Sequence, residues 1–136
     1  MVPNIAKSGS SFRGAGKYYL HDKAAERDGE RKPDTHERVA FTATRNCVND
    51  DPHRAIDEMW ATAAAQTELK RASGLSLGGR KCTDPVKTIS LSWHPSETPT
   101  PEQMIAAADS YLTRMGWNEH QAVYVGHNDT AHPHIH

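Results

Sequence analysis

Four of the nine histidines of this chain fall within its last ten residues, between His127 and His136. In an extended strand, residues i and i+2 point to the same face, so His134 and His136 are expected to project side by side. Pro133 is compatible with this strand, because proline is tolerated at a first strand position. A preceding strand that ends at His127 can add a third imidazole across a short turn. Three neutral imidazoles on one face form a site for a divalent metal ion with open coordination positions.

A chance cluster of surface histidines is the alternative, and three imidazoles on one predicted face argue against it. A metal ion held there would polarise a phosphate oxygen and offset charge in a transition state. Asp129 suits an outer role, in which its carboxylate accepts the spare ring N–H of a histidine and fixes the tautomer. As a turn residue, it could equally serve only to close the turn. His132 precedes Pro133, the first position of the expected strand, so it is expected to point away from the cluster, with a ligand or substrate contact as the alternative.

Such a site needs a nucleophile, which is either a bound water or a side chain, and Tyr18 and Tyr19 are the side-chain candidates. Free tyrosine has a pKa near ~10, so a neighbouring base or the field of a metal must activate it. The pair follows a segment, residues 1–17, that contains Lys7, Arg13 and Lys17 and no acidic residue. The alternative is that both tyrosines are ordinary core aromatics.

The length of 136 residues indicates one domain, which can bury a core but is too short for two. No apolar run approaches the ~20 residues that cross a bilayer, and the first residues lack the apolar core of a signal peptide. We therefore expect a cytoplasmic protein without membrane insertion. Cys47 and Cys82 are expected to remain reduced there.

The formal net charge of −1 argues against a strongly nucleic-acid-binding surface, since phosphate binding needs surplus positive charge. Two segments, residues 1–20 and 70–87, are nevertheless locally basic. Both contain glycines, which let a backbone approach a ligand closely. On charge alone, they are explained equally well as solvated loops.

Hydrophobic periodicity and capping signals define the elements that must position these residues. Asp51 before a proline predicts a helix start, and Thr100 with Gln103 has the form of a capping box. The expected order is a helix or loop, a surface loop or frayed segment (21–38), a strand (39–44), a helix (52–71), a loop (75–85), a strand (86–93), a helix from Pro101 that Gly116 stops, and a strand (121–126) leading into His127.

This order predicts an α+β fold, with an antiparallel or mixed central sheet and helices packed on one face. His136 falls in the middle of what should be another strand. We therefore expect residues 1–136 to be the N-terminal part of a domain that is truncated at its C-terminal end.

Two motifs together resemble those of a known family. Residues 11–18 (Ser-Phe-Arg-Gly-Ala-Gly-Lys-Tyr), with the later His127-x-Asp129 and residues 132–136 (His-Pro-His-x-His), are similar to the relaxases. Relaxases are the mobilisation nucleases of conjugative plasmids, in the superfamily named for its histidine–hydrophobe–histidine (HUH) motif. Ile135 supplies the hydrophobe, residues 90–95 and 100–102 fit as well, and the resemblance spans nearly the whole chain.

The resemblance implies a role for each site residue. The nicking tyrosine of the family lies six positions after the phenylalanine, which corresponds to Tyr18, with Tyr19 as the alternative. Asp129 corresponds to the acid that assists proton removal. The metal ligands correspond to His127, His134 and His136.

The resemblance also implies an activity, a cofactor and partners. Relaxases are metal-dependent, site- and strand-specific DNA endonucleases that nick the origin of transfer by tyrosine attack on a phosphodiester. They form a 5′-phosphotyrosyl link, leave a free 3′-hydroxyl and reverse the step after transfer. The expected cofactor is Mg²⁺ or Mn²⁺, with Zn²⁺ as an alternative. The expected partners are hairpin and single-stranded DNA at the origin, accessory mobilisation proteins and a conjugative secretion system.

Three other interpretations remain. A histidine-triad nucleotide hydrolase would share the alternating histidines of residues 132–136, but Pro133, Asp129 and the tyrosine pair argue against it. A replication initiator of the same superfamily would share the metal site. A DNA-binding or metal-binding module without catalysis would lose nothing when Tyr18 is replaced by phenylalanine.

Overall fold

The structure is a computed structural model, which describes residues 1–21 and 36–136. Most of the segment expected to be a surface loop or frayed, residues 21–38, therefore lies outside the described residues. Within the described part, five strands form one sheet in the order β1-β3-β5-β4-β2, and every neighbouring pair is antiparallel. The strands are β1 (Val2–Ile5), β2 (Val39–Arg45), β3 (Ile89–Ser92), β4 (Ala122–His127) and β5 (His134–Ile135). The prediction of an α+β fold with an antiparallel sheet is confirmed.

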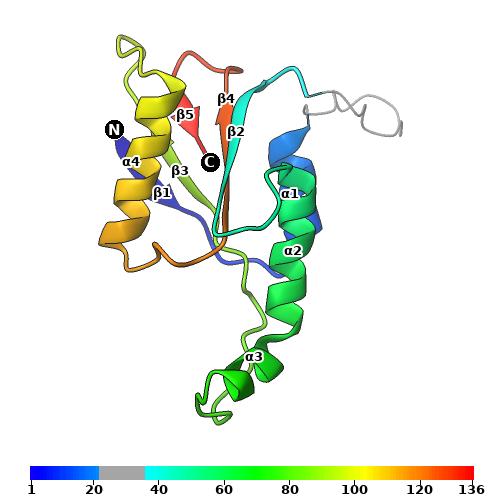
Figure 1. Ribbon diagram of the computed structural model, residues 1–136. Coiled ribbons are helices and arrows are strands. Elements are labelled where there is room, and N and C mark those ends of the chain that lie inside the picture. Colours follow the sequence, from blue (N-terminus) through cyan, green and yellow to red (C-terminus); the bar gives the residue numbers. More distant parts are fainter. Residues whose placement is uncertain (22–35) are drawn as a thin grey trace.

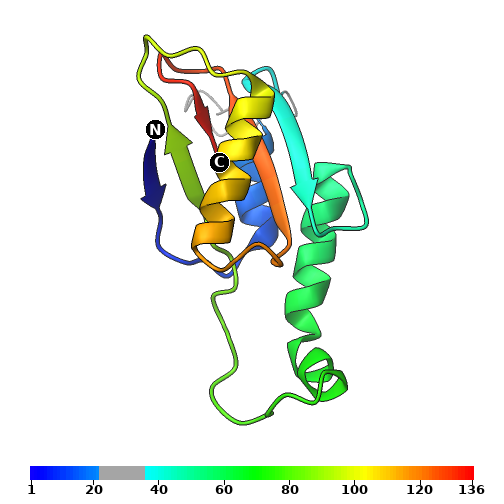
Figure 2. The same ribbon diagram turned by 60° about the vertical axis from the view of Figure 1, so that its left-hand side comes forward.

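The helices lie on both faces of this sheet (Figures 1 and 2), where one covered face was expected. One face is covered by α4 (Pro101–Arg114), and the opposite face by α1 (Phe12–Leu20) and α2 (Pro52–Ala64). The short helix α3 (Gln66–Ala72) projects beyond the sheet. The physical reason lies in β4, whose consecutive Val123, Tyr124 and Val125 present apolar side chains to both sides. A strand that is apolar on both faces needs cover on both.

The face under α4 carries the main hydrophobic core. Ile135, only 1% exposed, lies at its centre. The other buried members of the core are Leu91, Trp93, Met104, Ala108 and Tyr124. Since β3, β4, β5 and α4 all contribute, this core ties the short strand β5 to the rest of the sheet.

A polar network of three side chains lies at the edge of the sheet face that α4 covers. Arg45 donates to both carboxylate oxygens of Asp109 at 2.9 and 3.0 Å, and the Tyr124 hydroxyl donates to Asp109 at 2.9 Å. The hydrogen bonds from Arg45 hold the pKa of the Asp109 carboxyl below its usual value. Burial raises the pKa of the Tyr124 phenol, and its bond to Asp109 adds to that rise. The network joins β2, β4 and α4.

The local signals predicted most element boundaries. Asp51 caps α2 by accepting from the Arg54 amide at 2.9 Å, and the capping box at the start of α4 is present. Gly116 adopts a φ of 72°, the left-handed conformation that ends α4. One expectation was wrong, because the helix expected over 52–71 is divided at Ala65 into α2 and α3.

The side chain of Gln66 accounts for the division of that helix. It exchanges hydrogen bonds with the backbone N–H and C=O of Cys82, both at 3.1 Å, and also donates to Ala63 O. These bonds fix the chain where the axis changes direction. Among the described residues, no helix is long and apolar enough to span a membrane.

Candidate metal centre

The three histidines named from the sequence meet on the sheet face that α1 and α2 cover. His127 on β4 pairs directly with His134 on β5, and His136 exchanges two backbone hydrogen bonds of 2.8 Å with Val125. The ring centroids lie 4.8 to 5.4 Å apart. One nitrogen from each ring lies within 4.8 Å of the other two. Since two nitrogens bound to one ion at ~2.1 Å are at most about 4.2 Å apart, small ring rotations would close the set around an ion.

Two of these imidazoles have their orientation fixed by backbone carbonyls. His127 Nε2 lies 2.7 Å from Tyr19 O, and His134 Nδ1 lies 2.9 Å from His132 O. A carbonyl oxygen only accepts, so these ring nitrogens donate, and the other nitrogen of each ring keeps its lone pair. Fixing the tautomer in this way is a common device for histidines that bind metal ions.

Burial favours the neutral form of two of the three imidazoles. It lowers the pKa of His127, and it lowers the pKa of His136 to about 3, with the neighbouring histidines and Arg38 adding to the effect. A neutral imidazole offers the lone pair that a divalent ion needs. The donor set therefore fits a cation such as Mg²⁺, Mn²⁺ or Zn²⁺, with Zn²⁺ the best match to an all-nitrogen set.

Asp129 lies beside the imidazoles rather than among them. Its Oδ1 atom is 3.7 Å from His134 Nε2, and its Oδ2 atom is 3.5 Å from Nη1 of Arg38. This position differs from the outer role expected from the sequence, because the ring N–H of His134 goes to His132 O and the nitrogen that faces Asp129 keeps its lone pair. His132 turns away, and its Nδ1 lies 3.0 Å from Trp93 O.

Close packing of α1 against α2 determines where the two tyrosines lie. The Ser11 side chain caps α1 by accepting from the Gly14 amide at 2.9 Å. A Cβ atom at Gly16 would stand 2.7 Å from Cδ1 of Ile56, so a larger residue there would require the end of the Ile56 side chain to move. The last turn of α1 is thereby held over the histidines.

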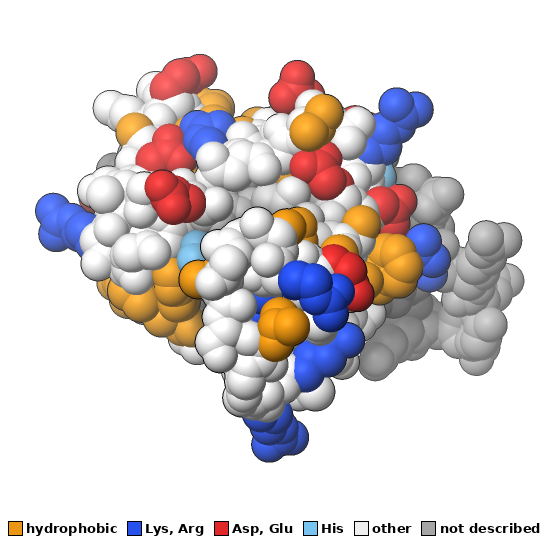
Figure 3. All heavy atoms as spheres, turned by 60° about the horizontal axis from the view of Figure 1, so that its bottom comes forward, with side chains coloured by type: hydrophobic (Ala, Val, Ile, Leu, Met, Phe, Trp, Pro, Cys, Tyr) orange, Lys and Arg blue, Asp and Glu red, His pale blue; other side chains and the backbone are white. Residues whose placement is uncertain are grey.

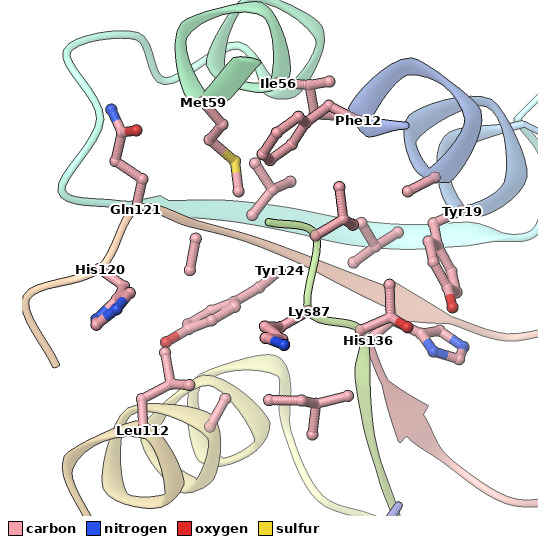
Figure 4. Close-up of a pocket in the computed structure, with 18 of the residues that line it drawn as sticks. Phe12, Tyr19, Ile56, Met59, Lys87, Leu112, His120, Gln121, Tyr124 and His136 are labelled. Carbon is pink, nitrogen blue, oxygen red and sulfur yellow. The ribbon is translucent and has the colours of Figure 1, made fainter. Parts of the chain in front are cut away.

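Tyr19 is the tyrosine in ring contact with the histidine cluster. Its ring centroid lies 4.6 Å from that of His136 and 6.4 Å from that of His127. In Figure 4 the hydroxyl end of Tyr19 points toward His136. Tyr18 packs edge-on against Tyr19 at 4.9 Å, and its side chain is 50% exposed. The structure thus brings the amino-terminal pair and the carboxyl-terminal histidines together.

Arg38 is a candidate site residue that sequence reasoning missed. It is 7% exposed, donates from Nε to His21 O at 2.7 Å, and lies 5.5 Å from the centroid of the Tyr18 ring. With its contact to Asp129, it connects the end of α1 with the turn before β5. The sequence predicts only a surface loop or frayed segment over residues 21–38, which includes Arg38. The only local signal was its position immediately before the apolar start of a predicted strand.

The two locally basic segments have different positions. A groove of about 300 Å³ runs beside α1, from Lys7 past Ser11 to Tyr18 and Tyr19. In contrast, Lys70 and Arg71 of the second segment lie in the last turn of α3, which projects at the opposite end of the molecule from β5 (Figure 1). Figure 3 brings that end forward and shows Lys and Arg side chains on it. Only the end of the second segment comes near the groove, where Lys87 donates to Ser8.

Comparison with known proteins gives one family and one curated relative. The model of the family "Relaxase: MobA/VirD2-like, nuclease domain" matches residues 19–136, a range that includes Tyr19, Asp129 and the three histidines but not Tyr18. Protein MobA of Acidithiobacillus ferrooxidans is 36% identical over 62 residues, which are 46% of this chain and 15% of that protein. The match thus covers a small part of the relative's length. No solved structure gives a significant match.

Proposed function

Since this chain belongs to the MobA/VirD2-like relaxase family, we propose that it carries the active site of a metal-dependent endonuclease that nicks one strand at an origin of transfer. The observation that carries the proposal is the meeting of Tyr19 with the cluster of His127, His134 and His136. A cation held by these imidazoles would polarise the scissile phosphate and offset the charge that develops on it.

Tyr19 is proposed as the attacking residue, with Tyr18 as the alternative. Two facts support this choice: the ring contact of Tyr19 with His136, and its hydroxyl directed toward that imidazole. The resemblance of residues 11–18 to the family supports Tyr18 instead. The exposed ring of Tyr18 would then have to reach the cation from the solvent side.

In the proposed step, the Tyr19 oxygen forms a bond to the scissile phosphorus while the bond from phosphorus to the 3′ oxygen breaks. The electron pair leaves with the 3′ oxygen, which takes up a proton and becomes a free 3′-hydroxyl. The phenol loses its proton as the attack proceeds, and Asp129 is proposed to assist that removal. The protein then carries the 5′ phosphate as a phosphotyrosyl ester, and the reverse reaction rejoins the strand.

The groove from Lys7 to the tyrosines supports a path for single-stranded DNA. Lys7 lines it at one end and Tyr18 and Tyr19 at the other, and the glycine and serine residues of its walls allow a backbone phosphate to approach. The proposed setting is the cytoplasm of a cell that transfers or mobilises DNA. There the full protein would act with hairpin DNA at the origin, accessory mobilisation proteins and a conjugative secretion system.

The experiment is a covalent-capture assay on the encoded protein. It is incubated with Mn²⁺ and a labelled single strand from the origin of transfer of its own element, and then separated under denaturing conditions. We expect a protein–DNA adduct that Tyr19→Phe abolishes and Tyr18→Phe largely retains. The reverse pattern would move the role to Tyr18. An adduct that survives the loss of both hydroxyls, or the absence of any adduct, would contradict the proposed chemistry.

A further inference from the structure

The short helix α3 and the loop that follows it form an exposed projection at the end of the molecule away from β5 (Figure 1). Every residue from 71 to 84 is exposed. Residues 70–83 contain four of the chain's 16 lysines and arginines and none of its 17 aspartates and glutamates. These cations form two pairs, Lys70 with Arg71 and Arg80 with Lys81, and neither pair lines the groove proposed for DNA.

Hydrogen bonds hold the loop alongside α3 and make the projection compact. Just past the end of the helix, the Leu75 amide donates to Lys70 O at 2.9 Å. Farther along, the Gln66 side chain exchanges two hydrogen bonds of 3.1 Å with the backbone of Cys82. Since α3 has seven residues and is only ~10 Å long, the loop starts and ends beside the two ends of one short helix. The first basic pair therefore lies at the end of α3, and the second lies near its start.

None of the four cations forms an ion pair with a residue that the structure describes. Elsewhere, Arg13, Arg38 and Arg45 each contact a carboxylate, at 3.4, 3.5 and 2.9 Å. An anionic partner at the projection would therefore gain attraction without first separating any of these existing pairs.

Three leucines give the same projection an apolar character. Leu69, Leu75 and Leu77 are between 47% and 61% exposed, and the last two lie in the chain between the basic pairs. In Figure 3, apolar side chains stand beside Lys and Arg side chains on the end that comes forward. Exposed apolar residues gathered on one small surface are typical of a contact site. We call the surface formed by these three leucines and the four cations the α3 patch.

We propose that the α3 patch binds an acidic amphipathic segment of a partner protein. The carboxylates of the segment would lie at the two basic pairs, and its apolar side chains would lie on the leucines. Charge complementarity makes the contact specific, because the whole chain has a formal net charge of −1. An acidic partner is thus attracted to this patch and not to the chain in general.

The leucines distinguish a protein from other anionic partners. Protein–DNA interfaces are polar and strongly positive, and a leucine adds nothing to phosphate binding. A lipid surface would take an irregular loop into hydrocarbon, where backbone groups without partners are strongly unfavourable. Between residues 76 and 81, one backbone amide has an acceptor among the described residues, since Gly78 N donates to Ser76 Oγ at 3.2 Å. A protein segment supplies carboxylates, apolar side chains and backbone groups together.

The test measures fluorescence anisotropy of a labelled, capped peptide of about 14 residues, which forms a helix ~20 Å long with leucines on one face and glutamates beside them. The encoded protein is titrated into this peptide and into two matched peptides. One has glutamine in place of glutamate, and the other has serine in place of leucine. We expect the first peptide to bind about tenfold more tightly than either matched peptide, and added salt to weaken its binding.

Single substitutions test whether the peptide binds at the α3 patch. Arg80→Gln and Leu77→Ser are each expected to weaken peptide binding by about threefold or more. The matched controls are Arg114→Gln, in the last turn of α4, and Val48→Ser, at an exposed apolar residue of another loop. Both controls should bind the peptide as the unaltered chain does. All four side chains are exposed, so folding should be unaffected.

Three results would overturn the proposal: no binding of the acidic peptide, equal binding of the three peptides, or equal losses in the patch variants and the controls. The same variants are tested with a labelled single-stranded oligonucleotide and with vesicles of anionic phospholipid. A loss of binding to either probe, with affinity for the peptide unchanged, would assign the patch to DNA or to lipid and would also overturn it. Tyr19→Phe should keep its affinity for the peptide, because the α3 patch does not depend on the proposed function.

Discussion

The two faces of the central sheet differ in character, although alternate residues of the same strand, β4, contribute side chains to both faces. On β4, Tyr124 turns toward α4, where Asp109 and the hydrophobic core satisfy it. Val125 and His127 turn to the other face, toward α1 and the histidine cluster. The first face has its polar groups paired within the chain. The second holds three imidazoles whose ring nitrogens lie close enough together to hold a cation.

Because of this difference, we expect residues that determine stability and residues that determine activity to lie on different faces of the sheet. Substitutions on the face under α4 should change the free energy of unfolding and leave the chemistry alone. Substitutions among the histidines should do the opposite, since a neutral, partly buried imidazole contributes little net stability when it awaits a ligand.

The largest effect is expected from His134→Ala. Removing one of three ligands should lower metal-dependent adduct formation by about 10³-fold or more, because the cation loses both affinity and position. The melting temperature without metal should change little. The measurement is adduct yield against Mn²⁺ concentration.

His132→Ala is the matched control for that variant. It removes a nearby imidazole that bonds to Trp93 O and is not part of the cluster. Adduct yield in this control should stay close to that of the unaltered chain. An equal loss in both variants would show that the face is sensitive to any change, and the division would fail.

A smaller effect, about 10²-fold, is expected from Arg38→Gln, because misplacing Asp129 and Tyr18 by a fraction of an ångström disturbs the reacting geometry. The measurement is the single-turnover rate of adduct formation at saturating Mn²⁺. Arg13→Gln serves as the control, since Arg13 is an exposed residue of α1 that pairs with Asp57. Rates that fall equally in the two variants would indicate a general charge effect rather than positioning.

On the opposite face, Asp109→Asn should lower the free energy of unfolding by about 1 kcal/mol, a modest value because Asp109 and Arg45 are more than a third exposed and screened by solvent. Adduct rates should be unchanged. Denaturant unfolding measures the first quantity and the capture assay the second. A fall in the adduct rate that the loss of folded protein does not explain would show that the two faces are coupled.

The smallest expected effect is a difference in pH dependence. The pKa of Asp109 is depressed in the folded state, so its contribution is fully present above the unfolded value of ~3.9 and is lost as pH falls through the lower folded value. Unfolding free energies of the unaltered chain and Asp109→Asn should therefore differ most above pH ~4 and converge below it. A constant difference down to pH ~2 would contradict this assignment.

The sequence predicted the parts of the site that depend on local geometry. Strand parity alone placed His134 and His136 on one face, and the turn after His127 brought in the third imidazole. Capping residues such as Asp51 and Thr100 located two helix starts for the same reason, since each acts within a few residues of chain.

Features that depend on distant partners could not be predicted in this way. The strand β1 is exposed along its length, contains Pro3 and forms an edge strand by pairing with β3 some 90 residues away, so no periodicity marks it. Arg38 looks like any surface charge until β4 and the end of α1 surround it. The contact between α1 and the histidines depends on the packing of Gly16 against Ile56, which local sequence does not reveal.

The most direct measurement of the central claim is anomalous diffraction from crystals of the chain grown with Mn²⁺. The account expects one strong peak about 2.1 Å from a nitrogen of each of His127, His134 and His136, with the Tyr19 hydroxyl directed toward it. A peak held by other residues, or imidazoles that bind no ion while Tyr19 turns away from them, would contradict it.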